Sequence, residues 1–305
     1  MTTTSLPLPG RIQGKVRDIY EVPGNRLGLV ATDRQSAFDR ILAAVPFKGQ
    51  VLNLISAWWF EKTAHIIPNH VLSVPHPNVT IAAKCTVFPV EVVVRGYITG
   101  STSTSLWTHY NKGERRYCGL DFPDGLVKNQ KLPTPVLTPT TKAESGDKPL
   151  SPAELVAQGY ISQEDWDYLS TKALEVFALG QELAAERGLI LVDTKYEFGR
   201  DSAGRIVIVD ELHTPDSSRF WWAATYQERF SQGQEPDSVD KEFLRLWFSR
   251  HCDPYADQVL PEAPKDLVAE LAWRYILLYE LITGKAFECK LESLEDVAAK
   301  LSAPS

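Results

Sequence analysis

Short apolar runs separated by turn residues dominate the first third of the chain, whereas apolar residues at helical spacing are commoner later. Residues 11–32 predict two or three strands with a hairpin turn at PGN, because Pro presets φ and Gly or Asn tolerates positive φ. The β-branched run VFPVEVVVR at residues 87–95 predicts a buried strand that Gly96 ends. Residues 122–152 form the longest irregular stretch, which is typical of a functional lid or a disordered loop.

Helices are predicted where apolar residues recur every three or four positions. The predicted helices cover residues 53–67, begin after Ser151 and after Ser162, follow a cap at Asp237 or Ser238, and cover residues 264–283. Ser151, Pro152 and Glu154 match a capping box, and Gly188 closes the helix that Ser162 begins. Trp273 of the last helix is expected on its packing face. Strands come first, then strands mixed with helices, then helices, and this order predicts an α+β fold.

The hairpin predicted within residues 189–222 carries the strongest candidate chemistry. Two apolar runs there each end in charged residues and flank the turn-rich sequence GRDSAG. Side chains alternate along a strand, so Asp193, Lys195 and Glu197 are expected on one face. A turn near residues 202–203 would bring Asp210 opposite Lys195, with Glu197 diagonal to it. These acids and the lysine form either a structural ion-pair network or a site for a divalent ion.

Three other segments are candidates for binding anions. Lys15 and Arg17 follow Gly14 and point the same way if the segment is a strand. Arg95 ends an apolar strand before glycines and hydroxyls that include Ser101. Asp216 could cap a short helix that places Arg219 beside free N–H groups. Each segment also has a simpler explanation, namely solvated surface charge, an arginine that reaches water, or a plain helix cap.

Composition narrows the class of protein further. Of 305 residues, 44% are hydrophobic and 23% charged, which is ordinary for a soluble globular chain of one large or two ordinary domains. The net charge of −7 argues against a general nucleic-acid binder. The four cysteines form no CxxC pair, and neither a signal peptide nor a membrane-spanning run is expected, so the cytoplasm is predicted. The six histidines lack zinc-site spacing.

An acidic, metal-type site combined with three anion-binding candidates points to a nucleoside triphosphate plus a second phosphorylated ligand. The segments GKVRDIY, VATDRQSAFD, VEVVVRGYITGS, LTPTTKAE, LVDTKYEFG and VDELHTPDSSRFW occur in this order over about residues 14–222. They resemble the signature segments of the SAICAR synthetase family. The segment TPTTKAE is similar to the longer form of that family, found in fungi and some bacteria.

The resemblance implies an ATP-dependent ligase of purine biosynthesis. Such an enzyme joins L-aspartate to the carboxylate of CAIR, through an acyl phosphate, and releases SAICAR, ADP and phosphate. It implies ATP and Mg²⁺ as cofactors and the α+β fold of the family. That fold has a small antiparallel, kinase-like N-terminal lobe (residues 1–88) and a larger ATP-grasp-like lobe with the C-terminal helices (residues 89–305), with ATP in the cleft between them. A monomer and a homo-oligomer both remain possible.

The resemblance also implies roles for individual residues. Lys195 and Asp193 would lie beside the reacting carboxylate as catalytic residues, with Lys195 stabilising charge on the acyl phosphate. Residues expected to bind ATP are Lys15 and Arg17 at the phosphates and Val87, Phe88 and Val90 at the adenine, with Glu197 and Asp210 holding Mg²⁺. Residues expected near the other substrates are Arg95, Ser101 and Arg219 at the CAIR phosphate, together with Asp216, Ser36, Asp39, Lys142 and Glu144.

Two other functions compete with this hypothesis. A small-molecule kinase would use the same ATP cleft but would release ADP without aspartate. A regulatory nucleotide-binding module would have lost Lys195, Glu197 or Asp210, and all three are present.

Overall fold

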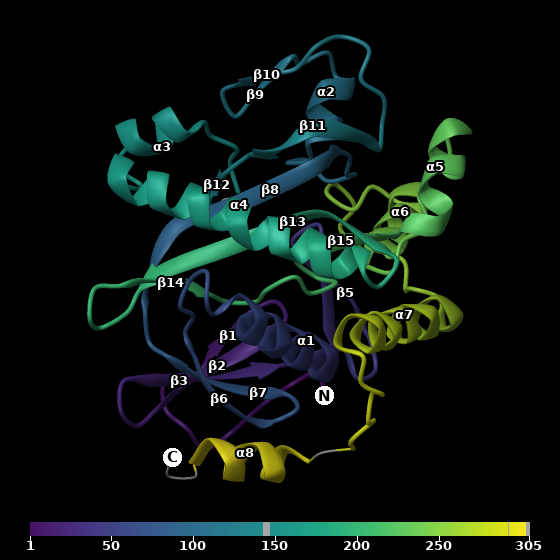
Figure 1. Cartoon of the computed structure of the whole chain (residues 1–305). Coiled ribbons are helices and arrows are strands. Elements are labelled where there is room, and N and C mark those ends of the chain that lie inside the picture. Colours follow the sequence, from purple (N-terminus) through teal and green to yellow (C-terminus); the bar gives the residue numbers. More distant parts are fainter. Residues whose placement is uncertain (143–146, 292, 303–305) are drawn as a thin grey trace.

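Two larger antiparallel sheets, each flanked by helices, and two two-stranded hairpins make up the fold (Figure 1). The computed structural model describes residues 1–142, 147–291 and 293–302. Glu144, which matches a family segment, lies outside the described residues. The expected α+β class agrees with this mixed architecture, because the strands of both sheets pair antiparallel.

The N-terminal sheet has the strand order β1-β2-β3-β7-β6. Its strands are β1 (Ile12–Gln13), β2 (Arg17–Val22), β3 (Arg26–Ala31), β6 (Val71–His76) and β7 (Val79–Ala83). The turn predicted at PGN joins β2 to β3, as expected.

The C-terminal helix α8 (Leu294–Ser302) returns to this first sheet. Figure 1 shows it below the sheet, at the opposite end of the molecule from α3. Its Val297 and Leu301 share one buried cluster with Tyr20 and Val30. The end of the chain, assigned to the larger lobe by the predicted division at residue 88, therefore contributes to the core of the smaller one.

Helix α1 (Lys48–Thr63) packs between the two parts of the fold. The apolar pattern predicts a helix at residues 53–67. Both ends of α1 lie nearer the N-terminus than the ends of that segment. The pattern misses its first turn because buried positions there carry polar side chains, including Lys48 and Gln50. Next to it stands the hairpin of β4 (Arg34–Ala37) and β5 (Arg40–Ala44).

The larger sheet has the order β11-β8-β13-β14, with β12 paired to β8 and β15 to β13. Its strands are β8 (Thr86–Ile98), β11 (Gln130–Leu137), β12 (Thr140–Thr141), β13 (Leu189–Arg200), β14 (Ile206–Val209) and β15 (Ser218–Trp222). The strand predicted at 87–95 is confirmed, but Gly96 does not end it. The segment 122–152 was wrongly predicted to be irregular throughout, because β11 and β12 lie within it. Two prolines in β11 obscure its pattern, and its register with β8 is irregular there.

Helix α4 (Gln163–Ala185) covers one face of the larger sheet (Figure 1). Its Val176 and Phe177 share a core with Val92, Val94 and Tyr196. The predicted capping box of α3 (Pro152–Ala157) and the Ser162 cap of α4 are both present. Because side chains alternate, the neighbouring residues on β8 and β13 face the opposite side of the sheet, away from α4.

The remaining elements lie outside the two larger sheets. They are α2 (Leu106–Asn111), β9 (Arg116–Tyr117), β10 (Leu120–Asp121), α5 (Ala223–Ser231), α6 (Glu242–His251) and α7 (Lys265–Thr283). The cap predicted at 237–238 is wrong, since α6 begins at Glu242, whose N–H donates to the Asp240 carboxylate. Trp273 of α7 is 56% exposed, so its expected packing role is also wrong. No helix in the described ranges is both long and apolar enough to span a membrane.

The packing of α8 yields a stability prediction. Leu301 is buried against Gly28 and Val22, so Leu301→Ala should lower the free energy of unfolding by about 2–4 kcal/mol. Leu294→Ala, at an exposed position of the same helix, should cost less than about 1 kcal/mol. Urea unfolding of both variants measures this, and equal effects would contradict the packing of α8 on the sheet.

Candidate active site

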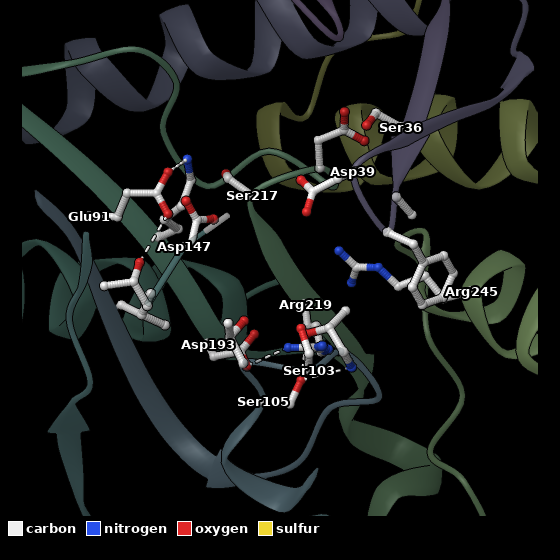
Figure 2. A pocket seen from close by; sticks show the side chains of 18 of the residues that line it. Ser36, Asp39, Glu91, Ser103, Ser105, Asp147, Asp193, Ser217, Arg219 and Arg245 are labelled. Atoms are coloured by element: carbon white, nitrogen blue, oxygen red, sulfur yellow. Dashed lines mark hydrogen bonds and ion pairs between the residues drawn. The ribbon is translucent and has the colours of Figure 1, made fainter. Parts of the chain in front are cut away.

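A pocket of about 570 Å³ opens on the face of the larger sheet that α4 leaves uncovered (Figure 2). β8 and β13 supply its floor, and the β4–β5 hairpin and α6 supply its walls. The structure brings together eight of the residues predicted from sequence as lining residues: Lys15, Ser36, Asp39, Arg95, Asp193, Lys195, Asp216 and Arg219. These eight predicted residues therefore lie together in one place in the fold.

Lys195 lies between two carboxylates at one end of the floor. Its ammonium is 2.6 Å from Glu91 Oε1 and 2.8 Å from Glu197 Oε1. This follows from the β13–β8 register, which sets Glu197 opposite Glu91 and Lys195 opposite Val93. The predicted alternation on β13 is confirmed, because Asp193 and Lys195 both line the pocket and Glu197 bonds to Lys195.

The charges of this trio depend on one another. Burial favours a lower pKa for Lys195, but Glu197 and Glu91 raise it well above its usual value. Burial raises the pKa of Glu91 above its ordinary range. Burial acts the same way on Glu197, yet Lys195 and Lys142 lower its pKa to about 2. Lys142 also donates a hydrogen bond to Glu197, and the pair keeps that carboxylate anionic at neutral pH.

Asp210 lies elsewhere than predicted. Glu197 pairs with Val209, so Asp210 falls beyond the end of β14 and the predicted register is wrong by one residue. The turn has three residues rather than two, and Gly204 takes a left-handed conformation there. Asp210 pairs with Arg17, whose guanidinium also lies 2.5 Å from Glu211. Among the described residues, no group of three or more His, Cys, Asp or Glu side chains converges on one point.

Arginines gather at the other end of the pocket. Arg219 Nη1 lies 2.6 Å from Asp193 Oδ2, and Arg95 Nη1 lies 3.5 Å from the same oxygen. The predicted helix at Ser217 is wrong, because Ser218 begins β15 and Arg219 pairs across the sheet with Asp193. Arg245 of α6 points into the pocket from the side opposite Glu91 (Figure 2).

Asp216 is held by a buried network rather than by a helix. Its carboxylate lies 2.7 Å from the Lys48 ammonium and 3.6 Å from that of Lys241, and it accepts a hydrogen bond from Tyr275 at 2.7 Å. Burial favours a higher pKa, but Lys241 and Lys48 hold the pKa of Asp216 well below its usual value. The network ties the pocket wall to α1, α6 and α7.

Several predicted residues do not line the pocket. The Ser101 hydroxyl donates to Glu242 at 2.6 Å, and Lys142 is engaged by Glu197. Of the three residues predicted at the adenine, Val90 is buried in the core, Phe88 packs against that core, and Val87 is 43% exposed. The side chain of Val90 therefore faces the core.

The pocket also contains residues that the sequence patterns did not predict. These are chiefly Glu91, Ser103, Ser105, Asp147, Lys241 and Arg245. Glu91 could have been predicted from the sequence. It is a glutamate within the apolar run VFPVEVVVR, two positions from Val93 and four from Arg95, and so lies on the same face of the strand. The basic pair at i and i+4 that Lys241 and Arg245 form was a weaker signal. Nothing local marks Ser103, Ser105 or Asp147.

Behind the floor, His213 is completely buried. It shares a hydrogen bond with the Tyr196 hydroxyl and packs edge-on against Trp59. A Cβ on Gly180 would come within 2.4 Å of the imidazole, so the ring fits against a bare helix backbone. Burial lowers the pKa of His213 to about 3, which keeps the ring neutral.

Comparison with known proteins identifies the chain's relatives. The family model for SAICAR synthetase matches residues 11–262. The phosphoribosylaminoimidazole-succinocarboxamide synthase of Legionella pneumophila (strain Lens) is 65% identical over 94% of this chain and 92% of its own. The chloroplastic enzyme of that name from Arabidopsis thaliana is 63% identical over 92% of this chain and 68% of its own.

Solved structures agree with these matches. The SAICAR synthase of Saccharomyces cerevisiae complexed with SAICAR superposes with a TM-score of 0.79 at 35% identity, over 94% of this chain and 99% of its own. A SAICAR synthetase in complex with ADP has a TM-score of 0.70 at 27% identity, over 92% and 100% of the two chains. Matches of this length and identity define an ATP-dependent ligase of purine biosynthesis. The chain belongs to the SAICAR synthetase family.

Neutral His213 predicts how folding stability depends on pH. Its pKa is lower in the folded than in the unfolded chain, so its stabilisation is complete above the unfolded pKa and is lost as pH falls towards about 3. The free energy of unfolding should therefore fall by up to about 1.4 kcal/mol per pH unit below about pH 6. His213→Asn should reduce that slope, whereas His251→Asn, at an exposed site, should not. Urea unfolding at several pH values tests this, and parallel curves for wild type and His213→Asn would contradict it.

Proposed function

We propose that this chain makes SAICAR from CAIR, L-aspartate and ATP through an acyl phosphate, with the two ends of its pocket dividing the work. The observation that carries the proposal is the single floor formed by β8 and β13. That floor presents Lys195 between Glu91 and Glu197 at one end and Arg95 with Arg219 at the other. A lysine held near a reacting carboxylate and arginines near a phosphate match the charges of CAIR.

The arginine end is proposed to bind the 5-phosphate of CAIR. Arg219 is buried, and its only described acidic partners are Asp193 and Glu242. Arg245 Nε is buried without a hydrogen-bond partner among the described residues, while its Nη1 donates to Glu242. Two guanidinium groups beside the hydroxyls of Ser103 and Ser105 suit a phosphate, which accepts several charge-assisted hydrogen bonds.

The other end is proposed to face ATP. Lys15 is exposed and contacts Asp39 across the pocket mouth, a place from which it can reach a phosphate. Arg17 is already paired with Asp210 and Glu211. To contact ATP, Arg17 must either leave these carboxylates or bind a phosphate in addition to them. This proposal includes a kinase-like N-terminal lobe and an ATP-grasp-like larger lobe. It also includes adenine binding along residues 87–90. A relative solved with ADP supports the use of a nucleotide.

Glu197 and Asp210 are proposed to hold Mg²⁺ on the ATP phosphates. Magnesium commonly takes one or two protein carboxylates together with phosphate oxygens and water. The low pKa of Glu197 makes it such a donor, and Asp210 is half-buried on the neighbouring turn. When bound, the ion would neutralise charge on the phosphates.

The chemistry then follows in two steps. A carboxylate oxygen of CAIR attacks the γ-phosphorus of ATP, and the bond to the β-phosphate oxygen breaks to release ADP. The aspartate amine, having lost a proton, attacks the carbonyl carbon of the acyl phosphate, and inorganic phosphate leaves as the amide forms. Lys195, the proposed catalytic lysine, keeps its positive charge because its pKa is raised, and it can stabilise the oxygens of the acyl phosphate. Asp193 holds the two arginines in place. A cytoplasmic location remains a prediction.

ADP release tests the function directly. Steady ADP release should require CAIR and L-aspartate together with ATP, because the acyl phosphate accumulates without the amine. A small-molecule kinase would instead release ADP steadily without aspartate. Coupled ADP assays with each substrate omitted in turn distinguish the two, and steady release without aspartate would contradict ligation.

Glu197→Gln should lower kcat about 100-fold or more while the fold stays intact, since it removes an anionic oxygen from the metal and from Lys195. Glu175→Gln on the exposed side of α4 is the matched control and should leave kcat unchanged. Steady-state kinetics and thermal melting measure both. Near-wild-type turnover of Glu197→Gln would rule out the metal assignment.

Arg219→Ala should mainly weaken CAIR binding. Loss of one buried phosphate anchor costs roughly 2 kcal/mol or more, which is about a 30-fold rise in KM for CAIR. Arg250→Ala, on the exposed part of α6, serves as the control. An unchanged KM for CAIR in a folded Arg219→Ala enzyme would remove Arg219 from the phosphate site.

A further inference from the structure

The loop of residues 100–105 closes the arginine end of the pocket. Thr102, Ser103, Thr104 and Ser105 line it, next to Arg219 (Figure 2). The loop is tight, because Gly100 has φ of 105° and a Cβ there would lie 2.3 Å from Ser105 Oγ. The role inferred for this loop rests on the proposed function, in which this end holds the CAIR phosphate.

Two side chains hold this loop from behind. His109 Nε2, on α2, lies 2.9 Å from the Ser103 carbonyl oxygen, and the Tyr117 hydroxyl, on β9, donates to the Thr104 carbonyl at 2.7 Å. Within the described part of the chain, the pocket lining includes neither His109 nor Tyr117. His109 and Tyr117 therefore bond these two carbonyl groups from the side of the loop away from the pocket, and Arg95 Nη2, on the pocket floor, also donates to the Thr104 carbonyl at 3.1 Å.

This arrangement favours an anion in the pocket. In a trans peptide the N–H points opposite to the C=O, so fixing the Ser103 carbonyl against His109 directs the Thr104 N–H the other way. Backbone N–H groups turned into a concave site bind anions, whereas a carbonyl turned inward would repel a phosphate. The orientation of one peptide thus affects the charge that the loop presents.

The partners of His109 determine which protons its ring must carry to keep both hydrogen bonds. Its Nδ1 lies 2.9 and 3.0 Å from the two carboxylate oxygens of Glu114, and its Nε2 faces the Ser103 carbonyl. Both partners only accept hydrogen bonds, and a neutral imidazole can donate from one nitrogen only. Both contacts are satisfied together only when the ring carries two protons.

Few other groups face the imidazole. Its ring packs against the phenol of Tyr117 with centroids 4.5 Å apart. The neighbouring Arg115 turns away, since its guanidinium lies over Tyr110 and bonds to Asp124. On the other flank of the loop, the Ser103 N–H donates to the Tyr255 hydroxyl at 3.1 Å. Among the described residues, Glu114 is the charged group that forms an ion pair with the ring.

We propose that protonated His109 is a positioning residue, which fixes the Ser103 peptide so that the loop binds the phosphate of CAIR. In a neutral ring that keeps Nδ1–H on the Glu114 carboxylate, the lone pair of Nε2 faces the Ser103 carbonyl and this contact is lost. The Ser103 peptide is then no longer held by His109, and the affinity for CAIR falls. The catalytic floor at Lys195 is unaffected.

The kinetic test compares His109→Phe with wild type from about pH 5.5 to 9, the range over which imidazole side chains titrate. The phenyl ring keeps the packing on Tyr117 and removes both hydrogen bonds. At the acid end, His109→Phe should raise KM for CAIR about fivefold, the change expected for one lost hydrogen bond, and should leave kcat and KM for ATP unchanged. The ratio of mutant to wild-type KM should fall towards one at the alkaline end. This ratio cancels the ionisation of the substrate phosphate itself.

Two further variants separate positioning from simple structural damage. Glu114→Gln offers Nδ1 an amide that can donate as well as accept, so a neutral imidazole can keep its Nε2–H on the Ser103 carbonyl and the KM for CAIR should stay low across the pH range. His251→Gln, at an exposed histidine of α6 that also bonds a backbone carbonyl, should match wild type at every pH. A mutant-to-wild-type ratio for His109→Phe that does not change with pH, or an unchanged profile for Glu114→Gln, would overturn the inference.

A second measurement does not depend on turnover. Nitrogen-15 NMR of the imidazole, assigned by its absence in His109→Phe, should show both ring nitrogens protonated under the conditions in which the KM for CAIR is lowest. A singly protonated ring under those conditions would overturn the inference. If wild type itself lacks aspartate-dependent ADP release, the proposed function fails. An active enzyme with a flat KM ratio contradicts the role of His109 alone.

Discussion

The antiparallel pairing of β13 with β8 is the constraint on which the rest of the site depends. It sets Glu197 opposite Glu91 and Asp193 opposite Arg95, on a face whose reverse side is packed against α4. Two carboxylates directly opposite each other repel, and Lys195 removes that repulsion by lying between them. Such a charged floor is costly in an apo protein unless each group is paired. The same ion pairs prepare the floor to bind charged ligands, because a charged group of a ligand can take the place of one partner in a pair.

The two sheets are coupled through charge as well as through packing. Arg17 of the N-terminal sheet pairs with Asp210 and Glu211 after β14, and a bridge between Asn69 and Ile208 lies close by. Asp216, with Lys48 and Lys241, ties α1 and α6 to the pocket wall. A ligand that takes up the charge of Arg17 or Asp210 must therefore rearrange contacts between the sheets. The proposed binding of ATP at these residues would therefore be linked to the relative position of the sheets.

Local patterns predicted the parts of this site that local geometry controls. The alternation of Asp193, Lys195 and Glu197 follows from strand geometry alone. The caps at Ser151 and Ser162 follow from the N–H groups that the first turn of a helix leaves free. The register of Asp210 failed by one residue because loop length, not the apolar pattern, decides it. Asp216 reads locally as a helix cap, but its real partners, Lys48 and Lys241, come from distant segments. The roles of Arg245 and Ser103 could be recognised only from the structure, which places α6 and the loop after β8 around the floor.

The most direct test of the proposed mechanism follows one oxygen atom. If the CAIR carboxylate attacks ATP, a carboxylate oxygen must leave with the phosphate when the amine displaces it. Enzyme supplied with CAIR labelled with oxygen-18 in that carboxylate, together with ATP and L-aspartate, should therefore yield inorganic phosphate carrying one labelled oxygen per turnover. Mass spectrometry of the phosphate reads this outcome. Phosphate without label, formed together with SAICAR, would contradict the acyl phosphate and the proposed role of Lys195.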